Sequence, residues 1–530
     1  MSTSAAPAAP AADVMTKRQI NEALVGMLLA MFTAFLSSTI VSNALPTIIV
    51  DLHGSQSQYT WVVTATLLAS TATTPIWGKL SDLISKKLLV QISIAIFTIG
   101  SVLAGFSSTM GELIAWRVLQ GLGLGGLQAL ITIVVAAMIS PRERGKYMGP
   151  ISAVMSVAPV AGPLLGGLLV DTPWLGWRWC FWVGVPLAAV ALVVVQRTLN
   201  LPVYRRKVQI DWAGATLIAG GVSTLLIWVT LAGNSFAWGS GASIALVAGG
   251  LALLAVAVWV ESRVAEPIIP LRLFTDRTTT LGILASIAVG TAMFGGAVFL
   301  GQYFQIARGY SATAAGLLSL PMILGSMISS TVSGALITRW GRWKGFLVAG
   351  SVLLTVGFGL LGTISHDTNM IYVGAAMFLA GLGLGSLMQN LVLAVQNSVP
   401  TKDLGAATST VTFFRSLGGT VGVSVLGSIL ATRVSSLTTQ GLVAEGIPVP
   451  AGGGAAGAGI GDLGTLPPQI AEIVRGAYGD ATATIFLVAA ALAVVSVVTV
   501  LFIREVPLQT TSGLQRQRTE TAEQEPATTP

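Results

Sequence analysis

Three polar residues inside one apolar stretch, 112–128, have the types and the spacing to do chemistry. Gln120 and Gln128 follow Arg117 by three and eleven residues, which places all three side chains on one face of a helix. A helix this apolar is expected to cross a membrane, where a charged side chain costs at least about 2.5 kcal/mol. Arg117 is therefore a candidate for coupling transport to an ion, or for fixing a positive charge beside a cavity.

The composition indicates a membrane protein that crosses the bilayer many times. Hydrophobic residues make up 53% of the 530 residues, charged residues only 9%, and the mean hydropathy is +0.80. Apolar runs of about 20 residues, long enough to cross roughly 30 Å of hydrocarbon, recur along the chain. We expect an all-α protein with fourteen spans, at 22–46, 59–78, 88–107, 112–138, 148–170, 178–197, 212–233, 241–260, 280–304, 313–337, 345–364, 370–394, 406–431 and 480–503.

The distribution of positive charge predicts the orientation. Most lysines and arginines fall in the loops of one side, and the other side holds only Arg178, Arg308, Arg433 and Arg475. Because cytoplasmic loops collect lysine and arginine, both termini are expected in the cytoplasm. The net charge of +7 is thus explained by the membrane surface, and no nucleic-acid partner is expected.

Metal, disulfide and nucleotide chemistry have little support in the sequence. The chain has one cysteine, Cys180, and two histidines, His53 and His366, which lie in short loops without partners at metal spacing. No phosphate-binding loop precedes a helix as it does in an ATPase. We expect no cofactor, no metal and no enzymatic activity, and transport driven by an ion gradient; the oligomeric state stays open.

An internal repeat divides the chain into two related halves. GLGLGGL at 121–127 recurs as GLGLGSL at 381–387, a shift of 260, and the basic loop after the second span recurs with a shift of 256. Parallel halves of this kind describe one transporter architecture, with the site near the midplane between them. The expected organisation is a disordered tail at 1–21, six-helix halves at 22–197 and 280–503, two inserted helices at 198–279, an outer loop at about 432–479 and a disordered cytoplasmic tail at 504–530.

The loop after the second span resembles the major facilitator superfamily. GKLSDLISKK at 78–87 follows the family pattern G-x-L-x-D-x-x-G-R-K at Gly78, Asp82 and Lys87, with Lys86 in place of the arginine. An acid at this position can pair with basic residues or with a helix N-terminus. The resemblance implies that these residues form a gate between the halves on the inner side.

Two further motifs are similar to this superfamily. Arg117, Gln120 and Gly121 match R-x-x-Q-G on span 4, whose arginine the resemblance associates with proton coupling; the alternative is a structural arginine capped by carbonyl groups. The exporter motif G-P-x-x-G-G is matched on span 5 by Gly162, Pro163, Gly166 and Gly167.

Stretches across 22–503 resemble the fourteen-helix drug:proton antiporter branch of the superfamily. They include DWAG at 211–214 and EPIIPLRLF at 266–274. The resemblance implies multidrug efflux by proton antiport across the cell inner (plasma) membrane, with a role in antibiotic resistance. Its partners would be the lipid bilayer, a small amphipathic substrate and a coupling proton.

Span 1 departs from the pattern of that branch. LSSTIVSNALP at 36–46 places Ser37 where the branch usually has an aspartate, and no aspartate or glutamate lies in the middle of any expected span. A serine does not titrate near neutral pH, so it cannot carry a coupling proton. With Arg117 and Arg415 as the only charges inside the membrane, we expect a net positive cavity that prefers neutral or anionic compounds to lipophilic cations.

Polar and aromatic residues on matching helices are candidates for the substrate path, because aromatic side chains and methionines give an adaptable apolar wall. They are Ser37, Ser38, Asn43, Trp61, Thr64 and Gln128 in the first half, and Met293, Phe294, Tyr303, Gln305, Asn390, Phe413, Phe414 and Arg415 in the second. Two alternatives to drug export stay open: transport of a lipid or cell-envelope intermediate, and a non-transporting membrane sensor or assembly partner.

Overall fold

A computed structural model describes residues 16–54, 56–172, 174–201, 211–232, 236–447, 467–513 and 515–516. Within these residues the fold is built from helices. The first half contains α1 (Lys17–Asp51), α2 (Gln56–Leu83), α3 (Lys86–Gly105), α4 (Met110–Met138), α5 (Pro141–Asp171), α6 (Trp179–Trp182) and α7 (Gly184–Thr198).

Two inserted helices, α8 (Trp212–Leu231) and α9 (Gly241–Glu261), precede the second half. That half contains α10 (Arg277–Gln302), α11 (Ala312–Leu318), α12 (Leu320–Trp340), α13 (Lys344–Leu361), α14 (Met370–Ser398), α15 (Leu404–Ala444) and α16 (Pro468–Phe502). Short turns of helix connect them at η1 (Leu271–Phe274), η2 (Tyr303–Ala307) and η3 (Thr401–Asp403).

The helix count agrees with the fourteen expected spans. Twelve helical stretches of the described residues are long and apolar enough to cross a membrane. Helices α2 and α5, which are 28 and 31 residues long, complete the set. The protein is therefore an all-α, multi-pass membrane protein, as the sequence predicts.

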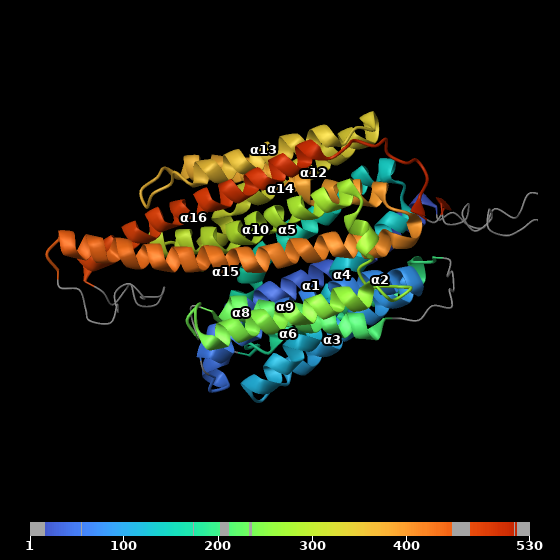
Figure 1. The fold of residues 1–530 in the computed structure, drawn as a ribbon. Coiled ribbons are helices and arrows are strands. Elements are labelled where there is room, and N and C mark those ends of the chain that lie inside the picture. Colours follow the sequence, from blue (N-terminus) through green and yellow to red (C-terminus); the bar gives the residue numbers. More distant parts are fainter. Residues whose placement is uncertain are drawn as a thin grey trace, which may run out of the picture.

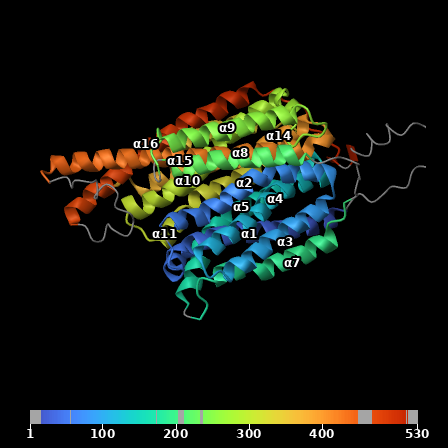
Figure 2. The same ribbon diagram turned by 60° about the horizontal axis from the view of Figure 1, so that its bottom comes forward.

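The two halves repeat the same packing. In the first half α4 packs on α2 and α3, and α1 packs on α5 and α7; in the second half α14 packs on α12 and α13, and α10 packs on α15 and α16. In Figure 1 most helices of the first half lie below the yellow to red helices of the second, while α5 lies beside α10; in Figure 2 the blue helices again lie mainly below the orange and red ones. Helix α8 contacts both α2 and α15, one helix from each half.

The repeated glycine motif explains how the helices of each half pack so closely. A Cβ atom on Gly121 would lie 2.5 Å from the carbonyl oxygen of Thr66, and one on Gly381 would meet that of Met322. These contacts are related by the shifts of 260 and 256 found in the sequence. The glycines therefore let backbones approach closely, as small residues do in membrane helices.

Three expected boundaries are wrong. Thr16 and Gln19 form a capping box that starts α1 at Lys17, so residues 17–21 are helical where a disordered tail was expected. The outer loop expected at 432–479 is shorter, because α15 continues to Ala444 and α16 begins at Pro468. Buried Val434, Thr438 and Leu442 continue the apolar face of α15, which explains the extension.

The start of the expected C-terminal tail is also placed against the bundle. Glu505 accepts hydrogen bonds from the backbone N–H groups of Trp343 (2.8 Å) and Lys344 (3.1 Å). The Gln509 N–H donates to Asn397 Oδ1 at 3.0 Å. These bonds order residues 504–513, contrary to the sequence prediction. Residues 1–15 and 517–530, also expected to be disordered, lie outside the described residues.

Candidate functional site

The two halves contact each other through α2 with α15 and through α5 with α11 and α12, and the charged contacts between them gather at one end of the bundle. We call this end the basic end, because it carries Lys79, Lys86, Arg144 and Lys402.

Two pairs of glycines form the closest contacts between the halves. A Cβ atom on Gly405 of α15 would lie 2.5 Å from the carbonyl oxygen of Gly78 on α2. On the other side, Gly145 of α5 and Gly334 of α12 are so close that a Cβ atom on either would meet the carbonyl group of the other. The shifts of 256 and 260 relate one pair to the other. The interface is therefore a symmetric contact of backbone on backbone.

Asp82 adds a charged contact on one side of this interface. Its carboxylate accepts the N–H groups of Gly405 and Ala406, each at 2.9 Å, in the first turn of α15. The first N–H groups of a helix lack partners within the helix and carry its positive dipole end. An aspartate of one half thus binds a helix N-terminus of the other.

The two lysines of the motif bind within the first half. Lys86 donates to the Ser81 carbonyl oxygen at 2.9 Å, and Lys87 donates to that of Gln196 at 2.7 Å. Of the four motif residues predicted to act together, Gly78 and Asp82 contact the opposite half and the two lysines do not.

The environment of Asp82 makes its charge sensitive to pH. Asp82 lies beyond the span expected at 59–78, at the basic end. Burial in the contact raises the pKa of Asp82 to about 7, against the opposing effects of the Lys86 charge and the two backbone N–H bonds. Because the contact raises this pKa, the closed arrangement binds a proton more tightly than an open one, and the contact weakens as the pH rises through this value.

Arg144 joins the halves on the other side of the interface, and sequence reasoning missed it as a site residue. It is 1% exposed and donates to Gln396 of α14, and to the carbonyl oxygens of Ala136 (3.1 Å) and Ile139 (3.0 Å) at the end of α4. A signal was present, because Arg144 directly precedes Gly145, the repeat partner of a glycine in the second half.

The geometry around Arg117 favours a structural role for this residue. Its side chain is 2% exposed and donates to the Val62 carbonyl oxygen (3.1 Å) and to Gln120 Oε1 (2.9 Å). Gln120 in turn donates to Ser101 of α3 at 2.6 Å. In the part of the chain that the structure describes, Arg117 forms no ion pair. The guanidinium joins α2, α3 and α4 within one half.

Arg415 is held in the same manner. It is 9% exposed and donates to the Met388 carbonyl oxygen of α14 at 3.1 Å. The neighbouring aromatics face other elements: Phe413 packs in a cluster with Ala72 and with residues of α8 and α9, and Phe414 makes an edge contact with Phe274 of η1.

Two further candidates for the substrate path, Tyr303 and Asn390, are buried inside the second half. Tyr303 donates to the Ser365 carbonyl oxygen at 2.7 Å, and Asn390 donates to Ser333 Oγ at 3.1 Å. Gln305 bonds within its own helix. The partly exposed candidates are Ser38, Trp61, Thr64, Gln128, Met293, Phe294, Gln305 and Phe414.

Ser37 and the exporter motif lie along the packed pair α1 and α5. Ser37 is 2% exposed, and its hydroxyl has no hydrogen-bond partner. A Cβ atom on Gly162 would meet the Thr39 side chain, so the glycine permits close packing of α5 on α1; Gly166 is also buried. The side chains of Asn43, Pro163 and Gly167 lie outside the described residues.

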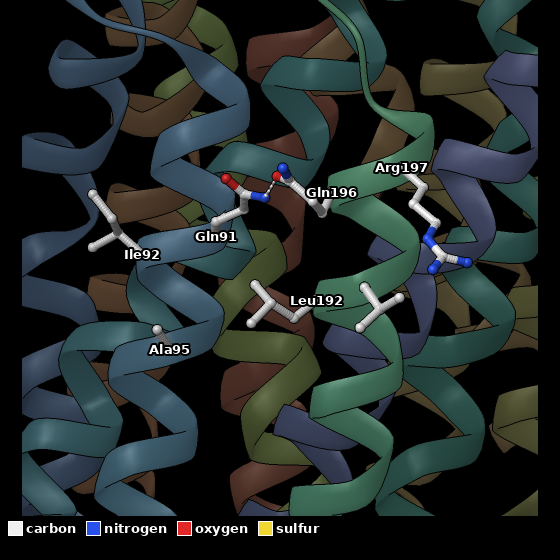
Figure 3. Close-up of a pocket in the computed structure, with 7 residues that line it drawn as sticks. Gln91, Ile92, Ala95, Leu192, Gln196 and Arg197 are labelled. Carbon is white, nitrogen blue, oxygen red and sulfur yellow. Dashed lines mark hydrogen bonds between the residues drawn. The ribbon is translucent and has the colours of Figure 1, made fainter.

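A surface groove between α3 and α7 has a volume of about 480 Å³. Figure 3 shows Gln91 and Gln196 hydrogen-bonded across it, above Ala95 and Leu192, while Arg197 points away from this pair. The groove lies on the outer face of the first half, so it is distinct from the contact between the halves.

The segment after α9 ties both halves together at the basic end. Lys79 of α2, which is 2% exposed, pairs with Glu266 at 2.6 Å. Six residues later, Arg272 pairs with Asp403 of η3 through two hydrogen bonds, at 3.0 and 2.6 Å. The bonds to Asp403 hold the pKa of Arg272 above its usual value. The strap 262–276 therefore bridges the halves across the basic end.

Two related helical halves joined at one end define the class of secondary transporters. Residues 27–423 match the family described as the Major Facilitator Superfamily. The chain belongs to this family.

Relatives of the chain are transporters. An uncharacterized MFS-type transporter of Mycobacterium tuberculosis is 37% identical over 488 residues, covering 92% of this chain and 70% of the relative. Two proteins of Bacillus subtilis are also similar: the multidrug transporter protein MdtP (36% identical; 79% of this chain, 77% of the relative) and multidrug resistance protein 3 (31%; 95% and 99%).

A solved structure of the proton:xylose symporter XylE shares the fold. Its TM-score is 0.60 at 14% identity, and the match covers 95% of this chain and all of the other.

The first prediction concerns the two hydrogen bonds of Asp82. Spin labels at Ile84 and Lys402, in a Cys180→Ser background, would report the distance between the halves at the basic end by pulsed electron paramagnetic resonance. We expect Asp82→Asn to raise the long-distance population about fivefold, since asparagine has one side-chain oxygen and leaves one of the two N–H groups without an acceptor, which costs about 1 kcal/mol. Asp276→Asn is the control, because Asp276 caps α10 within one half.

The second prediction is a pH dependence of the same distance. In the wild-type protein the long-distance population should grow as the pH rises through about 7, because the closed contact binds the Asp82 proton more tightly than an open, solvated state does. Asp82→Asn should abolish this dependence. A variant that keeps the wild-type pH profile would show that another group controls the contact.

The third prediction concerns the glycine contacts. Gly334→Ala should separate the halves at the basic end, because the added methyl group meets the Gly145 carbonyl and such overpacking costs about 1–3 kcal/mol. Gly345→Ala is the matched control, since a Cβ atom there meets nothing within 4 Å. Equal distance distributions for the two variants would contradict the prediction.

Proposed function

We propose that the protein is a secondary active exporter of amphipathic organic compounds or drugs. The observation that carries this proposal is the contact of two related halves at the basic end, in a chain of the major facilitator superfamily. Relatives named for multidrug transport and multidrug resistance support drugs as the substrate class. They also support a role in multidrug efflux and antibiotic resistance.

Alternating access is the mechanism that this architecture supports. The structure holds the basic end closed through the two glycine pairs, Asp82 and Arg144. Opening this end requires these contacts and the two ion pairs of the strap to break, while substrate enters between the halves near the midplane. Gly78 and Asp82 act as the gate in this scheme. Arg117 acts by holding α2, α3 and α4 as one rigid unit.

The basic end faces the cytoplasm in the proposed orientation. Lysine and arginine concentrate at that end, as they do on the cytoplasmic side of membrane proteins. Both termini then lie in the cytoplasm, and the membrane is the plasma (inner) membrane of the cell. Export would proceed from the closed basic end shown here through a state that is open to the cytoplasm.

Charge is the basis for the proposed substrate preference. Arg117 and Arg415 bring positive charge into the membrane region, and no carboxylate in the middle of an expected span offsets it. A low dielectric strengthens the effect of uncompensated charge on a bound compound. Neutral or anionic compounds are thus favoured over lipophilic cations. A proton gradient can drive the cycle only through a carboxylate outside the position of Ser37.

The fourth prediction tests substrate preference and energy source together. In vesicles containing the purified protein, an imposed pH gradient should drive a fluorescein-type anion at least about tenfold faster than ethidium. Ser37→Asp should raise ethidium transport by restoring an acid on α1, and Ser37→Asn is the uncharged control. Strong gradient-driven ethidium transport by the wild-type protein would contradict the preference, and failure to move any compound would contradict export.

A further inference from the structure

Two buried carboxylates lie close together where the inserted helices begin and end. Asp211 is the N-cap of α8, and Glu261 is the last residue of α9. They are 7% and 5% exposed. A Cβ atom on Gly214 would meet Asp211 Oδ2 and would lie 2.9 Å from Glu261 Oε1. Both oxygen atoms therefore border the same point beside Gly214.

The hydrogen bonds of the pair leave one oxygen atom without a partner. Asp211 Oδ1 accepts the Gly214 N–H at 2.8 Å. Glu261 accepts the N–H groups of Ile268 (2.9 Å) and Ile269 (3.0 Å), one on each oxygen. Asp211 Oδ2 is buried and has no hydrogen-bond partner. A buried acceptor that stays unpaired is costly.

The charges around the pair do not offset two negative groups. From α2 the facing charge is Lys79, which is already paired with Glu266 at 2.6 Å. Arg272 of η1 is paired with Asp403 of η3. Lys79 and Arg272 are thus matched by acids of their own, and Arg263, which is exposed, stacks on the Trp259 ring. Two carboxylates that share a buried site cannot both ionise without a large penalty.

We propose that Asp211 and Glu261 form a proton-binding site that lies outside the central path. One proton shared between Asp211 Oδ2 and Glu261 Oε1 gives the unpartnered oxygen a hydrogen bond, and the pair keeps one negative charge. The proton removes one of the two negative charges. It also leaves no buried oxygen atom of the pair without a partner.

A proton fits this site better than a metal ion does. The lone pairs of Glu261 already receive two backbone N–H groups, which repel a cation. Among the described residues, no group of three or more histidine, cysteine, aspartate or glutamate side chains could hold a metal. The pair therefore offers few free oxygen atoms to a cation.

The location links protonation to the contact between the halves. Glu261 binds the backbone at 268–269, and the same strap carries Glu266, the partner of Lys79 on α2. Loss of the shared proton would add a negative charge to the pair near Lys79, which interacts with Glu261 and lies one residue from the Gly78 contact. In this respect the inference rests on the proposed function: the pair supplies the titrating group that Ser37 cannot.

Infrared difference spectroscopy of the full-length protein in lipid vesicles tests the proton site directly. Raising the pH should remove a carboxylic-acid carbonyl band from the wild-type protein. Asp211→Asn and Glu261→Gln should each lack this band, and asparagine keeps the N-cap of α8. Exposed Asp480 provides the matched control, so Asp480→Asn should keep the band. A band from Asp82 is identified separately by its loss in Asp82→Asn.

Transport in the same vesicles tests the link to function. Asp211→Asn should lower pH-driven accumulation of the fluorescein-type anion about tenfold and leave its exchange without a gradient within about twofold. An unchanged band in Asp211→Asn overturns the proton site, as does binding of radioactive sodium ions that this substitution removes. If no compound moves in the wild-type protein, the proposed function fails, and the infrared result still decides the proton site.

Discussion

Close contact between helix backbones is the constraint on which this structure depends. Inside each half, glycines of α4 and α14 let these helices approach α2 and α12 at the distance of a carbonyl contact. Between the halves, Gly78 with Gly405 and Gly145 with Gly334 do the same. Lipid gives no hydrophobic force between helices, so association relies on van der Waals contact and on hydrogen bonds. The same kind of contact therefore holds each half together permanently and joins the halves reversibly.

Backbone groups also bind most of the buried charges. Arg117, Arg144 and Arg415 donate to carbonyl oxygens, while Asp82 and Glu261 accept N–H groups. A charge bound to backbone dipoles needs no second charged side chain, so it can stay buried when the surrounding helices move as a unit. The exceptions are the two ion pairs of the strap, Lys79–Glu266 and Arg272–Asp403. Both connect separate elements at the basic end, where motion is required.

The fold was predictable because it depends on periodic features, and the partners of single side chains were not. The repeat shifts of 260 and 256 reappear as equivalent glycine contacts, and the apolar runs became the helices. The motif around Asp82 indicated a contact with a basic group or a helix N-terminus, but its partner lies more than 320 residues later. Arg117 is a second residue whose partners could not be predicted from the sequence. The spacing put Arg117 and Gln120 on one face of α4, where their side chains are hydrogen-bonded. The residues of α2 and α3 that they also meet depend on how those helices pack, which spacing along α4 cannot reveal.

The inserted helices α8 and α9 are connected to both halves of the transporter. A pair of helices added between two complete halves could have served only to fill the bilayer. Instead α8 contacts a helix of each half, and the segment after α9 is ionically paired to both. The unpartnered oxygen of Asp211 lies at the base of this connection. The chain lacks an acid at the usual position of span 1, but it has a buried carboxylate pair beside the strap and α2. Protonation of this pair changes the charge next to Lys79.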